Sequence, residues 1–399
     1  MSSMRAALAA ILLASCSSEV PEPTGKEKDL ASRSSEFAFK LHGEVLRRYE
    51  GKNVFISPAS VMFALSMAAS GARGPTSDEI LAALELKGWK REDLDASCSA
   101  LLRWLEGGEP KVQLEVANSA WLRQDYPFEP GYLKDLAKFY RAQSSSLDFA
   151  NPKSLEKMNG WVKDRTHGKI QKAGPDQIDP ANDVLFLVNA VYFKGEWQRQ
   201  FIKAMTRDEP FQLGKGKTKT LPFMQRTASF NYVEAAVYRA LRIPYGDKDR
   251  MAFYVFLPKE GVSLGQLQDQ LASLGSKWIS GFQSNVVQLQ LPRFKLEFQV
   301  ELKSILSTLG MKKAMLPGQA DFSGMSPRGR ELSITAVYHK TYVDVNEEGT
   351  EAAATTTVAV AKAAEPSPPI PFKVDRPFFC AIVDNTTGSI LFTGSIADP

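Results

Sequence analysis

Apolar residues in the first third of the chain recur at the spacing of an amphipathic helix. A first helix is expected to start from a cap at Asp29 or Ser32. Ser57 and Pro58 supply an N-cap and a proline at the first helical position, so a second helix should begin there, after a short strand at 53–56. The spacing predicts helices at 59–70, 77–86 and 91–105.

Further along the chain the spacing of the apolar residues shortens from that of a helix to that of a strand, so strands become frequent. The middle of the chain predicts strands at 112–121 and 184–193 and helices at 130–140 and 152–166. From Phe211 onward we expect strands at 221–224, 229–234, 238–245, 251–257, 286–298, 332–345, 377–384 and 389–396, with helices at about 263–274 and 299–309. Helices first and strands later indicate the α+β class. No linker rich in proline and glycine divides this body, so we expect one large domain.

Composition and charge exclude several classes of protein. The 399 residues are 44% hydrophobic and 24% charged, which is ordinary for a globular protein and excludes a collagen-like or disordered chain. Lys and Arg number 49 against 45 Asp and Glu, and this net charge of +4 is spread too evenly to indicate a nucleic-acid partner. Zinc-site, dinucleotide and Walker-type motifs are missing, so we expect neither a metal nor a cofactor. Cys98 and Cys380 are expected to be buried and unpaired.

The N-terminus has the pattern of an export signal. The apolar run 6–14 spans about 14 Å as a helix, less than half of a bilayer core of about 30 Å, so residues 1–15 are predicted to be a signal peptide. The run ends in Leu-Ala-Ser-Cys16, which resembles a bacterial lipobox; the alternative is a plain secretory signal with an incidental cysteine. Polar residues 16–29 predict a flexible tether. We therefore expect a cell-envelope lipoprotein, tethered to a membrane through Cys16 on its periplasmic or surface face and otherwise secreted, with a folded body at 30–399.

One segment near the C-terminus could form a strand although it lies where a loop is expected. Its alternate positions 350, 352, 354, 356, 358 and 360 are Thr, Ala, Ala, Thr, Val and Val. None is charged, and all six would share one face of a strand that could be buried. A segment of this kind is an aggregation hazard when it is exposed, which favours a loop in one state and a strand in another. A plain additional strand or an Ala-rich helix is the alternative.

This segment and several others resemble one family. Glu347 to Ala354 is similar to the hinge of the reactive-centre loop of inhibitory serpins, and Asn189 to Trp197 resembles the serpin third-strand signature. Further similar stretches lie at 53–60, 321–325, 375–378 and 391–394, in family order over residues 30–399. The hinge positions are Glu347, Gly349, Thr350, Glu351, Ala352, Ala353 and Ala354.

The resemblance implies a fold and an activity. The fold would be the serpin fold, with about nine helices around three β-sheets and an exposed reactive-centre loop at about 347–371. A central five-stranded sheet would accept this loop as an additional strand. The activity would be that of a suicide substrate that traps a target serine protease in a covalent complex, so the protein would not be an enzyme. We expect a monomer that forms polymers on heating.

The resemblance also implies a cleavage site. Family spacing from Glu347 places the scissile bond at Ala363–Ala364, and the small residue suits an elastase-like or subtilisin-like protease. A loop shorter by one residue would instead place Lys362 at the specificity position, with a trypsin-like target. Inhibition of cysteine proteases and a non-inhibitory serpin that acts as a binding or chaperone-like module stay open.

Two internal clusters complete the resemblance. Trp197 matches the breach, the place where insertion begins, and it would also serve as a core aromatic residue. The shutter, a hydrogen-bonded cluster under the central sheet, is matched by Ser57, Ser60, Asn189 and His339. Lys215, Lys217 and Lys219 are expected to be a solvated turn rather than a cofactor site.

Overall fold

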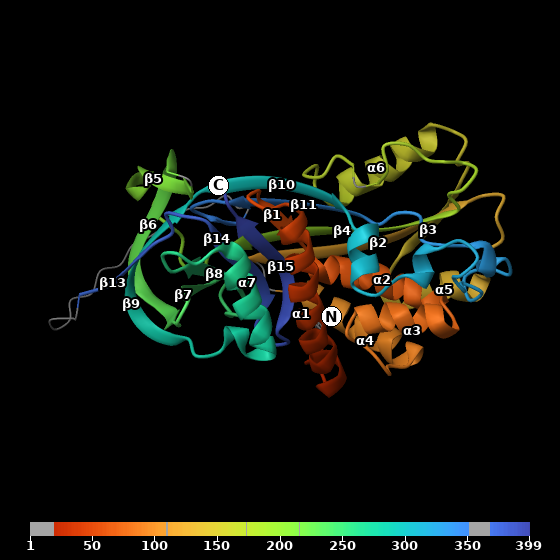
Figure 1. Cartoon of the computed structure of the whole chain (residues 1–399), viewed down its shortest axis with the longest axis horizontal. Helices are drawn as coiled ribbons and strands as arrows, with labels where there is room; N and C mark the ends of the chain where they lie inside the picture. The colour runs from red at the N-terminus through yellow and green to blue at the C-terminus, as the bar shows by residue number, and fades with distance from the viewer. Residues whose placement is uncertain (1–19, 109–110, 173, 215, 351–367) are drawn as a thin grey trace, which may run out of the picture.

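The part of the chain that the structure describes contains eight α-helices and two hydrogen-bonded sheets (Figure 1). The computed structural model describes residues 20–108, 111–172, 174–214, 216–350 and 368–399. Over these ranges no helix is long and apolar enough to cross a membrane. The helices are α1 (Gly25–Arg48), α2 (Pro58–Gly71), α3 (Gly74–Ala83), α4 (Arg91–Glu106), α5 (Pro130–Tyr140), α6 (Lys153–Arg165), α7 (Leu264–Ser273) and α8 (Lys303–Thr308). Nine helices were expected, so the described residues contain one fewer.

The first sheet has six strands in the order β10-β11-β12-β4-β2-β3. Its strands are β2 (Val112–Arg123), β3 (Gln143–Leu147), β4 (Leu185–Glu196), β10 (Phe294–Glu301), β11 (Tyr338–Val345) and β12 (Gly349–Thr350). It lies between α6 and α2 (Figure 1). Val188 and Ala190 pack on α6, whereas Leu187, Val191 and Phe193 pack into the main core, so the odd-numbered residues of β4 face α2.

The second sheet has nine strands, so the described residues form two sheets where three were expected. Its order is β1-β15-β14-β8-β7-β6-β9-β13, with β5 paired to β6. Its strands are β1 (Val54–Ile56), β5 (Arg207–Gly214), β6 (Lys217–Glu234), β7 (Tyr238–Pro244), β8 (Met251–Pro258), β9 (Gln283–Pro292), β13 (Ile370–Lys373), β14 (Phe378–Asp384) and β15 (Ser389–Ile396). The expectation of three sheets is wrong, because the 18-residue β6 joins its neighbours into one sheet. It pairs with β5 over residues 217–223, with β9 over 223–232 and with β7 over 231–234.

Helix α1 begins earlier than the sequence predicted. Thr24 and Glu27 form a capping box, in which the Thr24 backbone N–H donates to a Glu27 carboxylate oxygen at 2.7 Å. The predicted caps at Asp29 and Ser32 are therefore wrong, and residues 25–29 of the proposed tether belong to the helix. Val20 also lies against the end of α4, since a β-carbon at Gly107 would come within 2.5 Å of the Val20 side chain.

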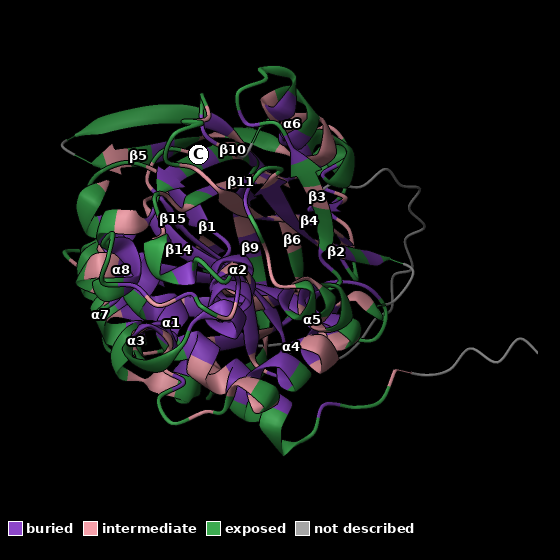
Figure 2. Ribbon diagram, turned by 90° about the vertical axis from the view of Figure 1, so that its right-hand side faces the viewer, coloured by how far each residue is buried: buried purple, intermediate pink, exposed green. Residues whose placement is uncertain are grey.

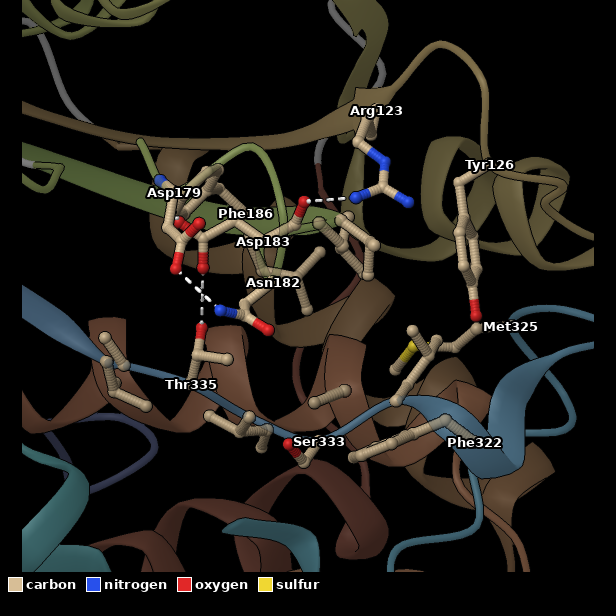
Figure 3. A pocket seen from close by; sticks show the side chains of 18 of the residues that line it. Arg123, Tyr126, Asp179, Asn182, Asp183, Phe186, Phe322, Met325, Ser333 and Thr335 are labelled. Atoms are coloured by element: carbon tan, nitrogen blue, oxygen red, sulfur yellow. Dashed lines mark hydrogen bonds between the residues drawn. The ribbon is translucent and has the colours of Figure 1, made fainter. Parts of the chain in front are cut away.

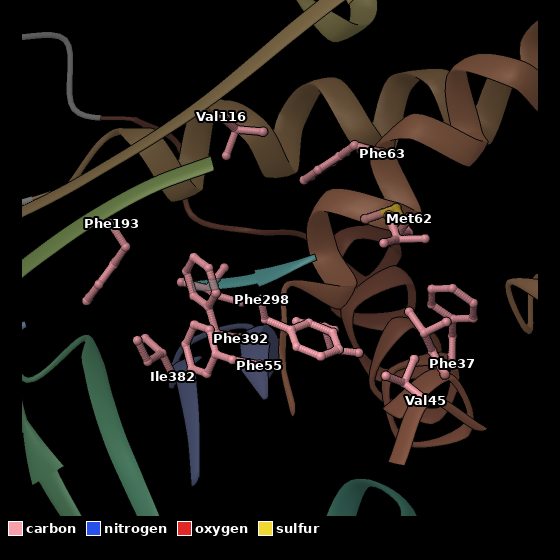
Figure 4. Packing of buried hydrophobic residues seen from close by; sticks show 14 of the residues in the cluster. Phe37, Val45, Phe55, Met62, Phe63, Val116, Phe193, Phe298, Ile382 and Phe392 are labelled. Atoms are coloured by element: carbon pink, nitrogen blue, oxygen red, sulfur yellow. The ribbon is translucent and has the colours of Figure 1, made fainter. Parts of the chain in front are cut away.

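The main core is built around α2. This helix is buried on nearly all sides and runs through the middle of the molecule (Figure 2). Met62 and Phe63 of α2 and Phe37 of α1 all belong to this core, and Figure 4 shows Met62 on the side of α2 that faces Phe37. Nearby, the rings of Phe55 and Phe392 stack with centroids 5.4 Å apart. Because α2 has no polar face that could lie against solvent, its neighbours must enclose it for the helix to be stable.

Candidate functional site

The hinge enters the first sheet between β4 and β11. Gly349 and Thr350 form β12, and Thr350 pairs with Gly195 of β4 on one side and Val345 of β11 on the other. Within the described ranges β4 and β11 do not pair with each other. Below β12, neither strand therefore has the other as a hydrogen-bonded neighbour. A β-carbon at Gly349 would lie 2.0 Å from the Gly195 carbonyl oxygen, so only glycine fits there.

Thr350 is enclosed at the top of the sheet. The residue is 2% exposed, and its Oγ1 lies 2.6 Å from the hydroxyl of Tyr245. The Tyr245 ring stacks on Trp197 with centroids 4.6 Å apart. Burial raises the pKa of Tyr245 well above its usual value, so this hydroxyl stays neutral and can donate or accept. A charged side chain at position 350 would lose its hydration in this place.

Two carboxylates fix the turn that leads into β12. Glu347 is 3% exposed; its carboxylate accepts a hydrogen bond from Thr206 Oγ1 at 2.7 Å and lies 3.5 Å from Arg293 Nε. Glu348 accepts from Lys203 Nζ at 2.6 Å, and this hydrogen bond raises the pKa of Lys203. The turn is thereby attached to the segment that follows β4.

Trp197 lies where the sequence placed the breach. Its indole Nε1–H donates to the Asn346 carbonyl oxygen at 2.8 Å, and its backbone N–H donates to the Glu348 carbonyl oxygen at 2.9 Å. The same ring stacks on Tyr245. Trp197 therefore joins the end of β4, the turn and the partner of Thr350 in one cluster.

The four residues predicted as the shutter come together under the sheet. The Ser57 backbone N–H donates to His339 Nε2 at 2.9 Å, and Ser57 Oγ donates to the Leu391 carbonyl oxygen at 2.7 Å. Ser60 donates to the Asn189 side-chain oxygen. Burial lowers the pKa of His339 to about 4, so its ring is neutral at pH 7 and Nε2 can accept. The cluster joins α2 to both β4 and β11.

Sequence reasoning missed Asn118, which belongs to the same network. It lies directly opposite Asn189 in the pairing of β2 with β4 and accepts a hydrogen bond from Asn189 Nδ2 at 2.6 Å. Its own Nδ2 donates to the Tyr140 carbonyl oxygen at 2.8 Å. An asparagine within an otherwise apolar strand pattern was the signal that could have identified it.

Another buried histidine was not assigned a role from the sequence. His42 lies between the hydroxyls of Thr393 at 2.9 Å and Ser395 at 2.8 Å, and burial lowers its pKa to about 3. It joins α1 to β15. Cys98 and Cys380 are buried and free, as expected.

Several predicted positions lie outside the described residues. The chain is described again from residue 368, and β13 pairs in parallel with β9. Arg239 donates to the Pro371 carbonyl oxygen at 3.1 Å, so the far end of the predicted loop is attached to the second sheet. The positions outside the described ranges are Cys16, Glu351, Ala352, Ala353, Ala354, Lys362, Ala363 and Ala364.

One stretch has the spacing of a hydrolase nucleophile but not its geometry. Gly261-Val262-Ser263-Leu264-Gly265 fits the pattern GxSxG. Ser263 is the N-cap of α7, and its Oγ accepts from the Gln266 backbone N–H at 3.2 Å while the Gln266 side chain caps in return. This serine therefore closes a capping box at the start of a surface helix, and no strand leads directly into it.

Comparison with known proteins identifies the family. Residues 32–399 match the family model described as Serpin (serine protease inhibitor). The leukocyte elastase inhibitor of Bos taurus is 35% identical over 383 residues, which cover 93% of this chain and 100% of that protein.

Two solved structures share the fold. Tengpin, a thermophilic serpin crystallised in the native state, is 31% identical with a TM-score of 0.85 and covers 95% of this chain and 96% of its own. The complex of thyroxine-binding globulin with thyroxine is 25% identical with a TM-score of 0.82 and covers 93% and 99%. The α+β class and the serpin fold are confirmed. The chain therefore belongs to the serpin family.

Proposed function

We propose that this protein is a suicide-substrate inhibitor of serine endopeptidases and not an enzyme. The observation that carries the proposal is β12: two hinge residues, Gly349 and Thr350, already lie between β4 and β11, and these strands do not pair below them within the described ranges. The residues that follow Thr350 at alternate positions are small or β-branched and uncharged. A cut loop could therefore continue β12 downward.

The proposed chemistry has one covalent step. The protease serine oxygen attacks the carbonyl carbon of Ala363, the bond to the Ala364 nitrogen breaks, and that nitrogen leaves with a proton. An ester then joins the protease to Ala363. Insertion of the freed segment before hydrolysis carries the protease away. About ten new backbone hydrogen bonds at about 1 kcal/mol each are comparable to the 5–15 kcal/mol that hold a protease domain folded.

The proposed specificity of the inhibitor rests first on the sequence of the loop. Ala363 before the scissile bond favours an elastase-like or subtilisin-like target, and Lys362 would favour a trypsin-like one. The similarity to leukocyte elastase inhibitor supports the first choice. A cysteine protease is a further candidate target.

A binding role without inhibition is the second candidate function. The structure of thyroxine-binding globulin with thyroxine favours it, because that protein shares the fold. The enclosed Thr350 favours inhibition, since a charged or bulky residue at this position would block insertion.

We also propose export and attachment to the cell envelope. The apolar run 6–14 followed by Cys16 supports a lipidated N-terminus that anchors a monomer to a membrane. Radiolabelled palmitate should be incorporated in a bacterial host and lost in Cys16→Ser. If the wild-type protein takes up no label, the protein is secreted rather than tethered.

Incubation with one elastase-like and one trypsin-like protease tests the inhibitory function. Intact-mass measurement under denaturing conditions should show the protease joined to the inhibitor without its last 36 residues, which are those after position 363. A product without the last 37 residues would instead place the cut after Lys362. Complete cleavage by both proteases without any adduct would contradict inhibition of serine proteases of these two classes.

A further inference from the structure

A buried carboxylate lies where three helices meet, outside the hinge, breach and shutter. Asp95 of α4 is 2% exposed, and it forms no ion pair in the described part of the chain. Arg91, one turn earlier on α4, is directed to Asp135 of α5 at 3.6 Å instead. Burial raises the pKa of Asp95 above its usual value. Because no cation pairs with this carboxyl group, it needs hydroxyl donors to be stable in the interior.

Two hydroxyl groups supply those hydrogen bonds. Tyr140 of α5 donates its O–H to Asp95 Oδ1 at 2.7 Å, and Ser70 of α2 donates to the same oxygen. The hydroxyl oxygens of Ser70 and Tyr140 also lie 3.2 Å apart, and both residues are buried. A charged acceptor strengthens a hydrogen bond, and buried polar groups polarise one another. Asp95 therefore holds α2, α4 and α5 together at one point.

The hydrogen bonds continue from Tyr140 to the shutter and return to α2. The Tyr140 carbonyl oxygen accepts from Asn118 at 2.8 Å, and Asn118 accepts from Asn189 at 2.6 Å. Asn189 in turn accepts from Ser60 of α2. Ser60 and Ser70 lie ten residues apart on this helix, a rise of about 15 Å. The result is a closed hydrogen-bonded ring that consists of Ser60, Asn189, Asn118, Tyr140, Asp95 and Ser70.

We propose that Asp95 is a positioning residue for the shutter and acts on it through Tyr140. The carboxylate fixes the Tyr140 hydroxyl, the Tyr140 carbonyl oxygen orients Asn118, and Asn118 orients Asn189 of β4. Weakening the acceptor at Asp95 should therefore loosen β4, which is one of the two strands that flank β12. The inference concerns the intact molecule and does not depend on the proposed inhibition.

A second tyrosine of α5 shows how a purely local hydrogen bond differs. Tyr132 is 4% exposed, and its O–H donates to the Met67 carbonyl oxygen of α2 at 3.1 Å. Among the described residues no side-chain hydrogen bond leads from Tyr132 to the shutter. Tyr132 and Tyr140 thus both join α5 to α2, but only Tyr140 belongs to the ring.

Amide hydrogen exchange in the intact protein tests the proposal. Asp95→Asn keeps the size of the side chain and removes its charge, whereas Tyr140→Phe removes the hydroxyl and keeps the carbonyl group that Asn118 uses. We expect each variant to lower amide protection about tenfold at 117–119 of β2 and 188–190 of β4, with protection at 380–384 of β14 unchanged. The double variant should lose no more than Tyr140→Phe alone, because both changes act through one link.

Two control variants remove a hydrogen bond outside the ring. Tyr132→Phe removes a buried hydroxyl from the same helix and should leave both stretches protected. Thr335→Val removes the hydrogen bond from Thr335 Oγ1 to Asp183 Oδ1 at 3.1 Å, which lies just before β4 on the wall of a cavity of about 570 Å³ (Figure 3). It disturbs β4 only at its end, so protection at 188–190 should be kept.

The outcomes separate positioning from other roles of Asp95. If Asp95→Asn lowers protection in α4 and α5 alone, or equally in β14, the carboxylate acts locally or on global stability, and the proposal is overturned. A control variant that matches Tyr140→Phe, or an additive loss in the double variant, overturns the route through Tyr140. Should Asp95→Asn fail to fold, Tyr140→Phe against Tyr132→Phe decides alone. None of these measurements needs a protease, so a negative result leaves the proposed function standing.

Discussion

At the scale of single residues, Thr350 is the side chain most sensitive to charge. It is 2% exposed, and its hydroxyl lies against that of Tyr245. Thr350→Arg should leave the protein folded and cleavable but convert it from inhibitor to substrate, because a buried guanidinium without a partner costs several kcal/mol. The fraction of protease in an SDS-stable complex measures this. Thr357→Arg, at an outward position, is the control; an equal yield of complex from Thr350→Arg would exclude insertion as the mechanism.

The hydroxyl of Tyr245 should hold the hinge in place. Tyr245→Phe removes the 2.6 Å hydrogen bond to Thr350 and should lower the free energy of unfolding by about 1–2 kcal/mol. It should also speed amide hydrogen exchange at Gly349 and Thr350. Tyr254→Phe is the matched control, because it loses a 2.7 Å hydrogen bond to Asn385 elsewhere. If both variants leave exchange at the hinge unchanged, the Tyr245 hydroxyl does not position it.

Two buried histidines should make the fold sensitive to acid. Burial lowers the folded-state pKa of His339 to about 4 and that of His42 to about 3, below their ordinary value of 6.5. The unfolded chain therefore binds these protons first, so the free energy of unfolding should fall as the pH drops from about 6.5 to about 4. Urea unfolding at pH 7, 5.5 and 4.5 measures this. The decrease in the free energy of unfolding should be smaller in His339→Gln than in the unaltered protein. His167→Gln is the control, because its ring is exposed, and it should show the same decrease as the unaltered protein. Equal decreases in the unaltered protein and both variants would show that His339 does not contribute.

Individual site residues were predictable from the sequence where the chain carries a recognisable motif. Ser57, Ser60, Asn189 and His339 were identified in this way, and the structure brings them together. Asn118 and Tyr245 were missed, because their roles depend on pairing between strands that are far apart in the sequence.

At the scale of elements, long periodic segments were predicted well and short ones were not. Helix α5 matches its predicted bounds of 130–140. The five-residue β3 and the four-residue β13 were missed, because neither is long enough to show a period. The predicted strand 286–298 is two strands that separate at Arg293 and belong to different sheets. No local pattern marks a chain that passes from one sheet to another.

The start of α1 depends on its capping box. Thr24→Ala should lower the free energy of unfolding by about 1 kcal/mol, since it removes the side chain that caps the helix. Circular dichroism during urea titration measures the change. Ser263→Ala at the start of α7 should cost a similar amount, and no loss in either protein would show that these caps do not limit stability.

At the scale of the whole molecule, the facing edges of β4 and β11, which pair with no described strand below β12, should make the intact protein prone to association. Heating should produce polymers in which the loop of one molecule enters the gap of the next. Size-exclusion chromatography with light scattering measures them. The cut protein, heated in the same way, should stay monomeric because its own strand fills the gap; equal polymerisation of both forms would contradict this origin.

The contact between Val20 and Gly107 limits how far the body could stand from a lipid surface. If Cys16 carries the acyl chains, only residues 16–19 separate the anchor from a segment that already touches the protein. Four fully extended residues reach about 14 Å, about twice the 5–8 Å that the headgroup layer adds on each side of a bilayer core. The folded body would then be held close to the membrane surface. It would reach only proteases near that surface and not those in the surrounding fluid.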